Sequence, residues 1–379
     1  MDMKEIREKI DAIDDTIVKA FEERMTLCGD IAEYKKANGL PVFFPARERE
    51  IVARITDGMD SQMATYTKVL YNTLFEVSRS YQTSRISDGG TLSEKIKAAA
   101  EDTENALPTK ATVACQGTEG AYSQVAAEKL FSIPSIMYMS NFEGVFNAVQ
   151  NGFCKYGILP LSNNLHGSVT EVYDLMKKHK FYIVKSIKVR VDHSLVAKCG
   201  ASLDGITEIF SHPQAIGQCS KFLSTLAGVK VTECANTAVA AKMVAESGRS
   251  DIAAICNPEC AALYGLAALK GGISDSDNNY TRFICISKQL EIYPGASKTS
   301  LMFTLPHKPG SLFSIIAKFA TLGVNFSKIE SRPIPGKDFE YMFYLDFDAP
   351  IFAEGFLETL DTFDAEFAGG SYLGSYSEI

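Results

Sequence analysis

Hydrophobic residues in the first segment of the chain recur with the spacing of a helix. Between residues 5 and 38 they lie mostly three or four positions apart, and Gly39 follows as a stop signal. They are Ile6, Ile10, Ile13, Ile17, Phe21, Leu27 and Ile31. One helix of this length would extend about 50 Å, more than a short helical segment can cover by folding on itself. We therefore expect a second copy of the chain to bury part of it, in a homodimer or a homotetramer.

Two more helices are predicted before this pattern breaks. Pro45 suits the first turn of a helix that ends near Ile55, and residues 63–84 repeat the helical spacing. Residues 86–110 carry glycine, charged residues and alanine without a convincing apolar face. The chain therefore begins with an all-α domain, residues 1–87, and a linker, residues 88–110, with room for one short helix.

From Ala111 onward, short apolar strands alternate with helical spacing. The first strand and helix cover residues 112–115 and 123–130, and a later pair covers residues 156–159 and 169–177. Alternation of this kind predicts an α/β domain with a largely parallel sheet. Residues 111–290 are enough for two lobes.

The last region, residues 297–379, has a third pattern. Strand and helix signals occur in the order βαββαβ, which predicts a small α+β domain. The expected elements are residues 301–305, 311–320, 325–331, 341–346 and 353–360, followed by a final strand. The fold class is therefore multidomain, with all-α, two-lobed α/β and α+β parts in that order.

Composition narrows the class of protein. No apolar stretch reaches the roughly 18 residues of a membrane span, and the charged start is unlike a signal peptide, so we expect no membrane partner and a cytoplasmic location. A net charge of −8 argues against general nucleic-acid binding. The nine cysteines are scattered, and the closest pair, Cys256 and Cys260, lacks the partners of a zinc site. We expect no metal.

Thr281 and Arg282 place a hydroxyl beside a guanidinium where the apolar run Phe283–Ile286 begins. An unpaired buried polar group costs roughly 1–3 kcal/mol, so such a pair is either hydrogen-bonded or offered to a ligand. For a lone Thr-Arg-Phe, a surface cap on the strand is the better explanation. The pair gains weight from other polar stretches in the same region.

Four such stretches occur in order between residues 111 and 288: Gly117–Ser123, Pro160–Val169, Ser211–Gln218 and Asn279–Phe283. Each taken singly is ordinary turn and cap chemistry. Together they closely resemble prephenate dehydratase. The resemblance implies a fold like that of periplasmic binding proteins, with prephenate in a cleft between the lobes losing carbon dioxide and its ring hydroxyl to give phenylpyruvate.

The same resemblance implies roles for individual residues. Thr281 would donate a hydrogen bond to the departing hydroxyl, and Arg282 would lie near a carboxylate or brace its strand. The other substrate-binding residues would be Ser123, Asn163, Ser211 and Gln218. The family usually has Glu where this chain has Ser162. His166 and His212 are candidate substitutes, with ordinary structural roles equally open.

Polar side chains on the N-terminal helices form a second pattern. Arg24 and Lys35 are eleven residues apart, so they share one helix face, and Ser78 and Gln82 share a face on the third helix. Around the helix axis, Arg7 lies about 100° away from the face that Arg24 and Lys35 share. We therefore expect Arg7 to reach a pocket of the partner chain. Solvated charges would give the same periodicity.

These segments resemble the all-helical chorismate mutase family over residues 1–85. Rearrangement of chorismate to prephenate is pericyclic, so the site must hold a folded dianion and stabilise negative charge on the ether oxygen. The resemblance implies that Arg7 and Arg24 clamp the carboxylates, and that Lys35 and Gln82 donate to the ether oxygen. It implies further binding or catalytic roles for Arg47, Glu48 and Ser78. Phe44 stands where the family commonly has Asp, so a helix cap and a polar contact are lost.

Two motifs of the last region, Pro309–Leu312 and Glu330–Pro333, resemble the ACT domain that accompanies these dehydratases. The resemblance implies phenylalanine as an allosteric inhibitor, bound across a dimer interface and acting through its different affinity for two states. The effector residues would be Gly310, Ser311, Leu312, Glu330, Ser331 and Arg332.

We therefore expect a bifunctional chorismate mutase and prephenate dehydratase of phenylalanine biosynthesis that needs no metal or organic cofactor. One alternative keeps the dehydratase but makes the helical region a degenerate dimerisation module, as Phe44 suggests. Another is a non-catalytic amino-acid sensor. The presence of Thr281 together with Asn163, Ser211 and Gln218 argues against the sensor.

Overall fold

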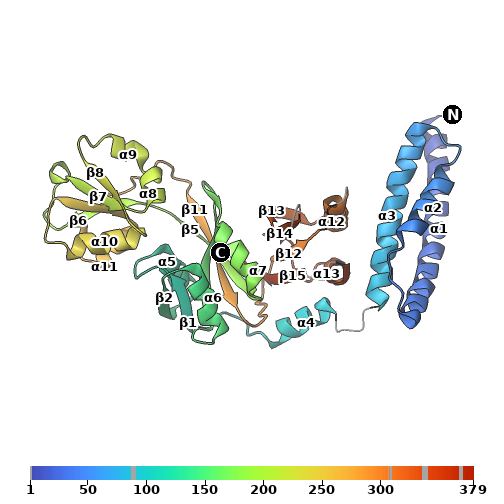
Figure 1. Cartoon of the computed structure of the whole chain (residues 1–379), viewed down its shortest axis with the longest axis horizontal. Helices are drawn as coiled ribbons and strands as arrows, with labels where there is room; N and C mark the ends of the chain where they lie inside the picture. Colours follow the sequence, from blue (N-terminus) through green and yellow to red (C-terminus); the bar gives the residue numbers. More distant parts are fainter. Residues whose placement is uncertain (1, 87–90, 306, 308–309, 335–339, 367–369) are drawn as a thin grey trace. The chain divides into compact units, whose positions relative to one another are not determined.

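The structure of the chain is a computed structural model, which describes residues 2–86, 91–305, 307, 310–334, 340–366 and 370–379. Its contacts divide it into two compact units. Unit 1 contains Met1–Ala98 and Leu301–Tyr372, and unit 2 contains Ala99–Ser300 and Leu373–Ile379. Figure 1 shows the elements of each, coloured from blue at the N-terminus to red at the C-terminus.

The helical part of unit 1 consists of α1 (Met3–Asn38), α2 (Pro45–Thr56) and α3 (Ser61–Ile86). A capping box begins α1, in which Asp2 and Glu5 each accept a hydrogen bond from the other's backbone N–H, and Gly39 ends the helix in the left-handed conformation. The predicted single long helix is confirmed. Large apolar side chains of α1 remain outside any core, since Ile10, Ile13 and Ile17 are 50%, 59% and 59% exposed.

The C-terminal region has the predicted element order. It comprises β12 (Lys298–Thr304), α12 (Ser311–Ala320), β13 (Asn325–Pro333), β14 (Tyr341–Asp348), α13 (Phe356–Glu366) and β15 (Ser371–Tyr376), in a sheet of order β13-β14-β12-β15. Packed aromatic rings form its core, with Phe319 4.2 Å from Phe347 in a tilted pair and Phe303 4.8 Å from Phe363 in an edge-to-face pair, measured between ring centroids. The last helix was expected from Ala353. It begins later because Ala353 and Phe356 close successive turns through backbone hydrogen bonds.

The segment expected as a linker contains one helix, α4 (Leu92–Asp102). Lobe 1 of unit 2 follows it. Its sheet has the order β2-β1-β3-β11-β5, with β4 paired to β3. The strands are β1 (Lys110–Gln116), β2 (Ile133–Met139), β3 (Tyr156–Asn163), β4 (Gly167–Ser168), β5 (Tyr182–Arg190) and β11 (Tyr280–Ser287), and the helices are α5 (Tyr122–Leu130), α6 (Phe142–Gln150) and α7 (Thr170–Lys178).

Lobe 2 is one continuous segment between β5 and β11, and it forms a second sheet of order β10-β6-β9-β7-β8. Its strands are β6 (Ser194–Lys198), β7 (Glu208–Ser211), β8 (Lys230–Glu233), β9 (Ile252–Cys256) and β10 (Leu266–Lys270), and its helices are α8 (Pro213–Gln218), α9 (Ser220–Ser224), α10 (Thr237–Glu246) and α11 (Pro258–Leu263).

The expectation of a largely parallel sheet is correct only in part. Strands β1, β2 and β3 are parallel, but β11 runs antiparallel to both β3 and β5, and lobe 2 also mixes the two directions. The physical reason is the route of the chain. It leaves lobe 1 at the end of β5 and returns from lobe 2 along β11, so these neighbouring strands run in opposite directions.

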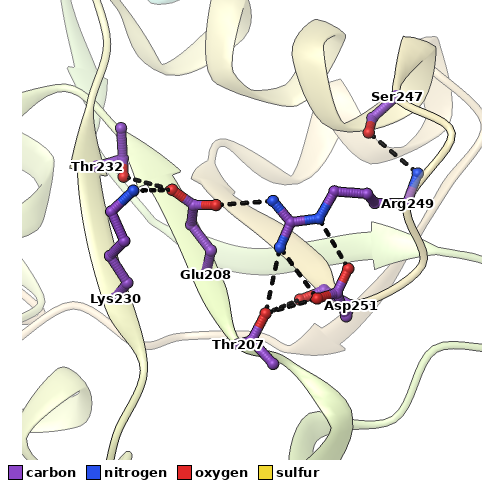
Figure 2. Close-up of polar contacts among 7 residues, drawn as sticks. All are labelled: Thr207, Glu208, Lys230, Thr232, Ser247, Arg249 and Asp251. Carbon is purple, nitrogen blue, oxygen red and sulfur yellow. Dashed lines mark hydrogen bonds and ion pairs between the residues drawn. The ribbon is translucent and has the colours of Figure 1, made fainter.

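A network of charges fastens the edge strand of lobe 2 (Figure 2). Glu208 of β7 accepts hydrogen bonds from Lys230 and Thr232 of β8, both at 2.7 Å, and from Arg249 at 2.8 Å. Arg249 also pairs with Asp251 at 2.9 Å. These bonds hold the pKa of Glu208 down to about 2, with the Lys230 bond as the largest cause. The network therefore joins β8 to the rest of the sheet while both acids stay ionised.

Candidate active sites

A cavity of about 390 Å³ lies between the two lobes of unit 2. Lobe 1 contributes the end of β1, the start of α5, the end of β3 and the start of β11, and lobe 2 contributes α8 and the start of α10. The polar lining residues are Gln116, Tyr122, Ser123, Asn163, His193, His212, Gln214, Gln218, Asn236, Thr237 and Thr281. All four polar stretches found in the sequence therefore contribute to this cavity. Asn163 and Thr281 contact each other, and the other two stretches supply Ser123 and Gln218.

Asn163 sets the direction in which the Thr281 hydroxyl acts. Its Nδ2 donates to Thr281 Oγ1 at 3.0 Å and to Asn279 Oδ1 at 2.8 Å. Its Oδ1 accepts from the backbone N–H groups of the next turn, at Leu165 and His166. Because Thr281 Oγ1 already accepts a hydrogen bond, its own hydrogen is available to a molecule in the cavity.

His193 orients the Gln218 amide in a similar way. The two side chains meet at 2.8 Å between His193 Nε2 and Gln218 Oε1, and because an amide oxygen can only accept, Nε2 carries the hydrogen. The Gln218 amide N–H groups are thereby left for a ligand. Burial lowers the pKa of His193, which favours the neutral imidazole. Sequence reasoning missed this residue.

The cavity offers hydrogen-bond donors to an anion without using Lys or Arg side chains. Among the described residues that line it, none is Lys or Arg. Instead, α5 and α10 begin at the cavity wall, and the start of a helix presents unpaired backbone N–H groups and the positive end of the helix dipole. Asn236 caps α10 by accepting from the Val239 N–H at 2.7 Å. Neutral donors of this kind suit carboxylates.

The lobes are tied together beside the cavity. Asn257 Nδ2 of lobe 2 donates to the Gly120 carbonyl at 2.7 Å, and Tyr264 donates to the Glu119 carbonyl at 2.7 Å. Gly120 has φ +88°, and a β-carbon there would lie 2.8 Å from Cys260 Sγ. This close approach explains the need for glycine in the Gly117–Ser123 stretch.

Three other predicted site residues have structural partners. Ser123 lines the cavity but its hydroxyl donates to the Gln116 carbonyl at 2.6 Å. Ser211 does not line the cavity. It is fully buried, and its hydroxyl donates to the Ile255 carbonyl at 2.8 Å. Arg282 does not line the cavity either, because it points to the side of β11 opposite Thr281 and binds Tyr376 and Glu378.

Ser162, which stands where the family usually has Glu, does not line the cavity either. It pairs with Ser168 across β3 and β4. Of the two candidate substitutes, His166 is exposed and does not line the cavity. His212 does line it, and its Nδ1 caps α8 by accepting from the Gln214 N–H at 3.2 Å.

On the N-terminal helices, α1 and α3 bring two predicted pairs together. Arg24 donates to the hydroxyl of Ser78, and Lys35 Nζ donates to Gln82 Oε1 at 2.8 Å. Ser78 and Gln82 are 4% and 6% exposed, so these polar groups lie in a desolvated row. Burial lowers the pKa of Lys35, while nearby Cys28 and Glu48 act in the opposite direction.

Glu48 has a partner that the sequence did not suggest. Arg79 of α3 forms an ion pair with it, and the Arg79 guanidinium also lies 5.0 Å from the centre of the Phe43 ring. Glu48 lines a hollow of about 550 Å³ between α2 and α3. Arg47 is exposed and pairs with Glu50 at 2.9 Å, and Arg7 is exposed on α1.

Phe44 takes the N-cap position of α2 without a side-chain hydrogen bond, as its sequence position predicted. Its ring instead lies 5.1 Å from Lys35 Nζ. An aromatic ring thus stands where the family commonly has a capping group, and it makes a cation–π contact with the partly buried Lys35 ammonium.

The predicted effector residues fall into two places. Gly310 is the N-cap of α12, and Ser311 and Leu312 form its first turn, while Pro309 lies outside the described residues. Glu330, Ser331 and Arg332 follow one another on β13, where Ser331 is exposed and its neighbours are half-buried.

Two family models match this chain. The prephenate dehydratase family model matches residues 113–291, and the chorismate mutase type II model matches residues 6–83. A bifunctional chorismate mutase/prephenate dehydratase of Aquifex aeolicus is 30% identical over 92% of this chain and 90% of its own length. Arogenate dehydratase/prephenate dehydratase 2 of Arabidopsis thaliana is 36% identical over 71% of this chain and 73% of its own length.

Among solved structures, a prephenate dehydratase of Arthrobacter aurescens in complex with L-Phe has a TM-score of 0.65 and 29% identity, covering 70% of this chain and 89% of that one. The helical match and the two-lobed match correspond to the two activities in the name of the bifunctional relative. The chain belongs to the family of bifunctional chorismate mutase/prephenate dehydratases, which rearrange chorismate to prephenate and convert prephenate to phenylpyruvate in phenylalanine biosynthesis.

Proposed function

We propose that dehydration takes place in the cavity between the lobes, with Thr281 as the donor to the departing ring hydroxyl. The observation that carries this assignment is the hydrogen bond from Asn163 to Thr281 Oγ1. It leaves the hydroxyl hydrogen directed to a ligand. Prephenate breaks two bonds, to its ring carboxylate and to its ring hydroxyl, and gives carbon dioxide, hydroxide and the phenylpyruvate anion.

A threonine hydroxyl is far too weak an acid to surrender its proton outright near neutral pH. Thr281 therefore acts as a hydrogen-bond donor that stabilises negative charge on the leaving oxygen, and aromatisation of the ring drives the reaction. Gln218, held by His193, and the starts of α5 and α10 bind the carboxylates. The dianion is thus held by uncharged groups, with Asn163 as the residue that fixes Thr281.

The mutase site lies along the row formed by α1 and α3. Arg24 with Ser78 binds a carboxylate, and Lys35 with Gln82 donates to the ether oxygen. Glu48 accepts from the substrate hydroxyl. The exposed Arg7 serves the site of a partner chain, and Arg47 binds substrate at the edge. The exposed apolar side chains of α1 support a homodimer or homotetramer.

Residues 297–379 act as an ACT regulatory domain that binds phenylalanine. Support comes from the βαββαβ order and from the L-Phe complex of the Arthrobacter aurescens relative. Gly310, Ser311 and Leu312 would meet the charged ends of the amino acid, with Glu330 to Arg332 beside them. The proposed domains are residues 1–87, 111–290 and 297–379, joined by the linker 88–110, in a cytoplasmic enzyme.

Substitution of Thr281 tests the central assignment. Thr281→Ala should lower dehydratase kcat by about 10²- to 10³-fold, the usual effect of removing one preorganised donor, and should leave chorismate consumption unchanged. Thr281→Ser keeps the hydroxyl and should retain most of the activity. Both rates are measured by ultraviolet absorbance, on chorismate and on prephenate. Full phenylpyruvate formation by Thr281→Ala would exclude this role.

A further inference from the structure

The last residues of the chain are bound to the dehydratase sheet. Strand β5 is the outermost strand of that sheet, and residues 377–379 run along it. The Ser186 N–H donates to the Ser377 carbonyl at 3.1 Å, the Ile379 N–H donates to the Ser186 carbonyl at 3.0 Å, and the Lys188 N–H donates to the Ile379 carbonyl at 2.8 Å. These residues extend the sheet by a short added strand.

Glu378, in the middle of this segment, forms ion pairs with three nearby cations. Its carboxylate lies 2.7 Å from Lys188 Nζ, 2.8 Å from Arg282 Nε and 3.7 Å from Lys298 Nζ. Ser186 also donates to it at 3.1 Å. The Glu378 and Arg282 side chains are 10% and 11% exposed. Loss of the carboxylate would leave a nearly buried guanidinium without this counter-charge, which is costly in a desolvated place.

Tyr376 holds the same guanidinium from a second side. Arg282 Nη2 donates to the Tyr376 hydroxyl at 2.7 Å, and that hydroxyl also lies 2.6 Å from Ser300 Oγ. Two residues earlier, Gly374 allows β15 to approach β5, because a β-carbon at this position would overlap the Ile183 carbonyl oxygen. The segment from Gly374 to Ile379 is therefore fitted to this side of lobe 1.

Arg282 follows Thr281 on β11, at a place where the pairing with β5 is continuous but the pairing with β3 is irregular. The register between β3 and β11 is regular at Thr281 and Arg282 and shifts between Arg282 and Phe283. Such irregularities re-aim neighbouring side chains and are frequent beside active sites. An anchored Arg282 would hold the backbone on the side of this shift that carries Thr281.

We propose that Glu378 and Tyr376 are positioning residues of the dehydratase, which hold Arg282 and through it the direction of the Thr281 hydroxyl. The inference rests on the proposed role of Thr281. It makes the final segment of the chain, beyond the residues matched by the dehydratase family model, a working part of the dehydratase site. The competing explanation is that Glu378 and Tyr376 only stabilise the fold.

The test compares Glu378→Gln and Tyr376→Phe with the wild-type chain, using chorismate turnover by the same molecules as an internal control. Both variants should lower dehydratase kcat more than they change KM for prephenate, because Thr281 is displaced while the cavity remains. A loss of up to about 100-fold is expected, the cost of misplacing a reacting group by about 1 Å. The matched control is Glu358→Gln, at an exposed position on α13.

A double-mutant cycle separates positioning from stability. If Glu378 acts through Arg282, the double variant Glu378→Gln/Arg282→Gln should be no slower than Arg282→Gln alone. Melting temperature is measured on each variant. Wild-type kcat in Glu378→Gln and Tyr376→Phe would overturn the inference. So would additive losses in the cycle, or a loss of dehydratase turnover that follows melting temperature and mutase turnover.

Thr281→Ala in the same series keeps the two proposals apart. A fully active Thr281→Ala would remove the proposed role of Thr281 and with it the positioning of that residue. An inactive Thr281→Ala beside a fully active Glu378→Gln would overturn the positioning inference alone.

Discussion

The two catalytic regions of this chain differ in how much of each site one chain supplies. The dehydratase cavity is enclosed by two lobes of a single unit, and its key hydroxyl and amide are already oriented by Asn163 and His193. The proposed mutase site is a row of polar groups on two helices, with Arg7 facing solvent and apolar residues of α1 exposed around it.

The difference follows from the chemistry. A folded dianion that rearranges without proton transfer needs fixed cations, and a long helix can present its own cations to two sites if two chains pair along it. Loss of hydroxide needs a dry and enclosed donor, which a cleft between lobes provides. The proposed sites therefore make one region dependent on a partner copy and the other on two lobes that are joined within the chain.

The largest expected effect concerns the mutase row. Arg24→Ala removes the guanidinium that donates to the Ser78 hydroxyl. The change should lower mutase kcat/KM by about 10²- to 10³-fold, as for other preorganised charge contacts. Dehydratase turnover should stay at the wild-type level, as measured on prephenate. A parallel fall of both activities would contradict the separation of the two regions.

Dependence on a partner copy can be tested on the exposed face of α1. Ile13→Asp introduces a charge where an apolar contact is expected, and should shift the chain toward monomers and lower mutase turnover at least about tenfold at low protein concentration. Dehydratase turnover should fall less. Lys19→Asp, placed on another side of the same helix, is the control. Light scattering gives the mass, and unchanged mass with unchanged mutase turnover would rule out this face as the interface.

A smaller effect is expected at the proposed effector site. Arg332→Ala should weaken phenylalanine inhibition of the dehydratase by about tenfold, within the usual range of allosteric coupling, without changing the uninhibited rate. Arg332→Lys keeps the charge and should weaken inhibition less. Inhibition curves on prephenate give the result, and identical curves for all three proteins would remove Arg332 from the site.

The smallest effect concerns stability at the edge of lobe 2. The folded-state pKa of Glu208, about 2, lies below its unfolded value of about 4.3. The stabilisation is therefore complete above the unfolded value and is lost as pH falls through the folded value. Glu208→Gln should melt below the wild type at pH 7, and the two should converge as pH approaches 2. Exposed Glu233→Gln serves as the control, and an equal shift at every pH would contradict this origin.

Sequence patterns predicted the local features well. The long helix was predictable because its spacing, its cap at Asp2 and its end at Gly39 all lie within the same stretch of chain. Thr281 was singled out by its place at the start of an apolar strand, and it lines the cavity between the lobes. Ser78 and Gln82 were predicted to share one face of the third helix, and the structure shows that both contact α1.

Features that depend on distant segments were not predictable in this way. The Asn163–Thr281 bond joins residues 118 positions apart, and the antiparallel direction of β11 depends on the route through lobe 2. His193 lies in a short connection without periodicity, so no pattern marked it. Arg79 sits among other charged residues of α3, and only the packing of α2 against α3 singles it out as the partner of Glu48.

The placement of β11 has a consequence for how the enzyme is made. This strand lies between β3 and β5 inside the lobe 1 sheet, yet the whole of lobe 2 precedes it in the chain. Chains fold from the N-terminus as they leave the ribosome. During synthesis β5 therefore has no paired neighbour in its sheet until lobe 2 has emerged. Lobe 2 can fold first, and lobe 1, which carries Thr281, is completed after it.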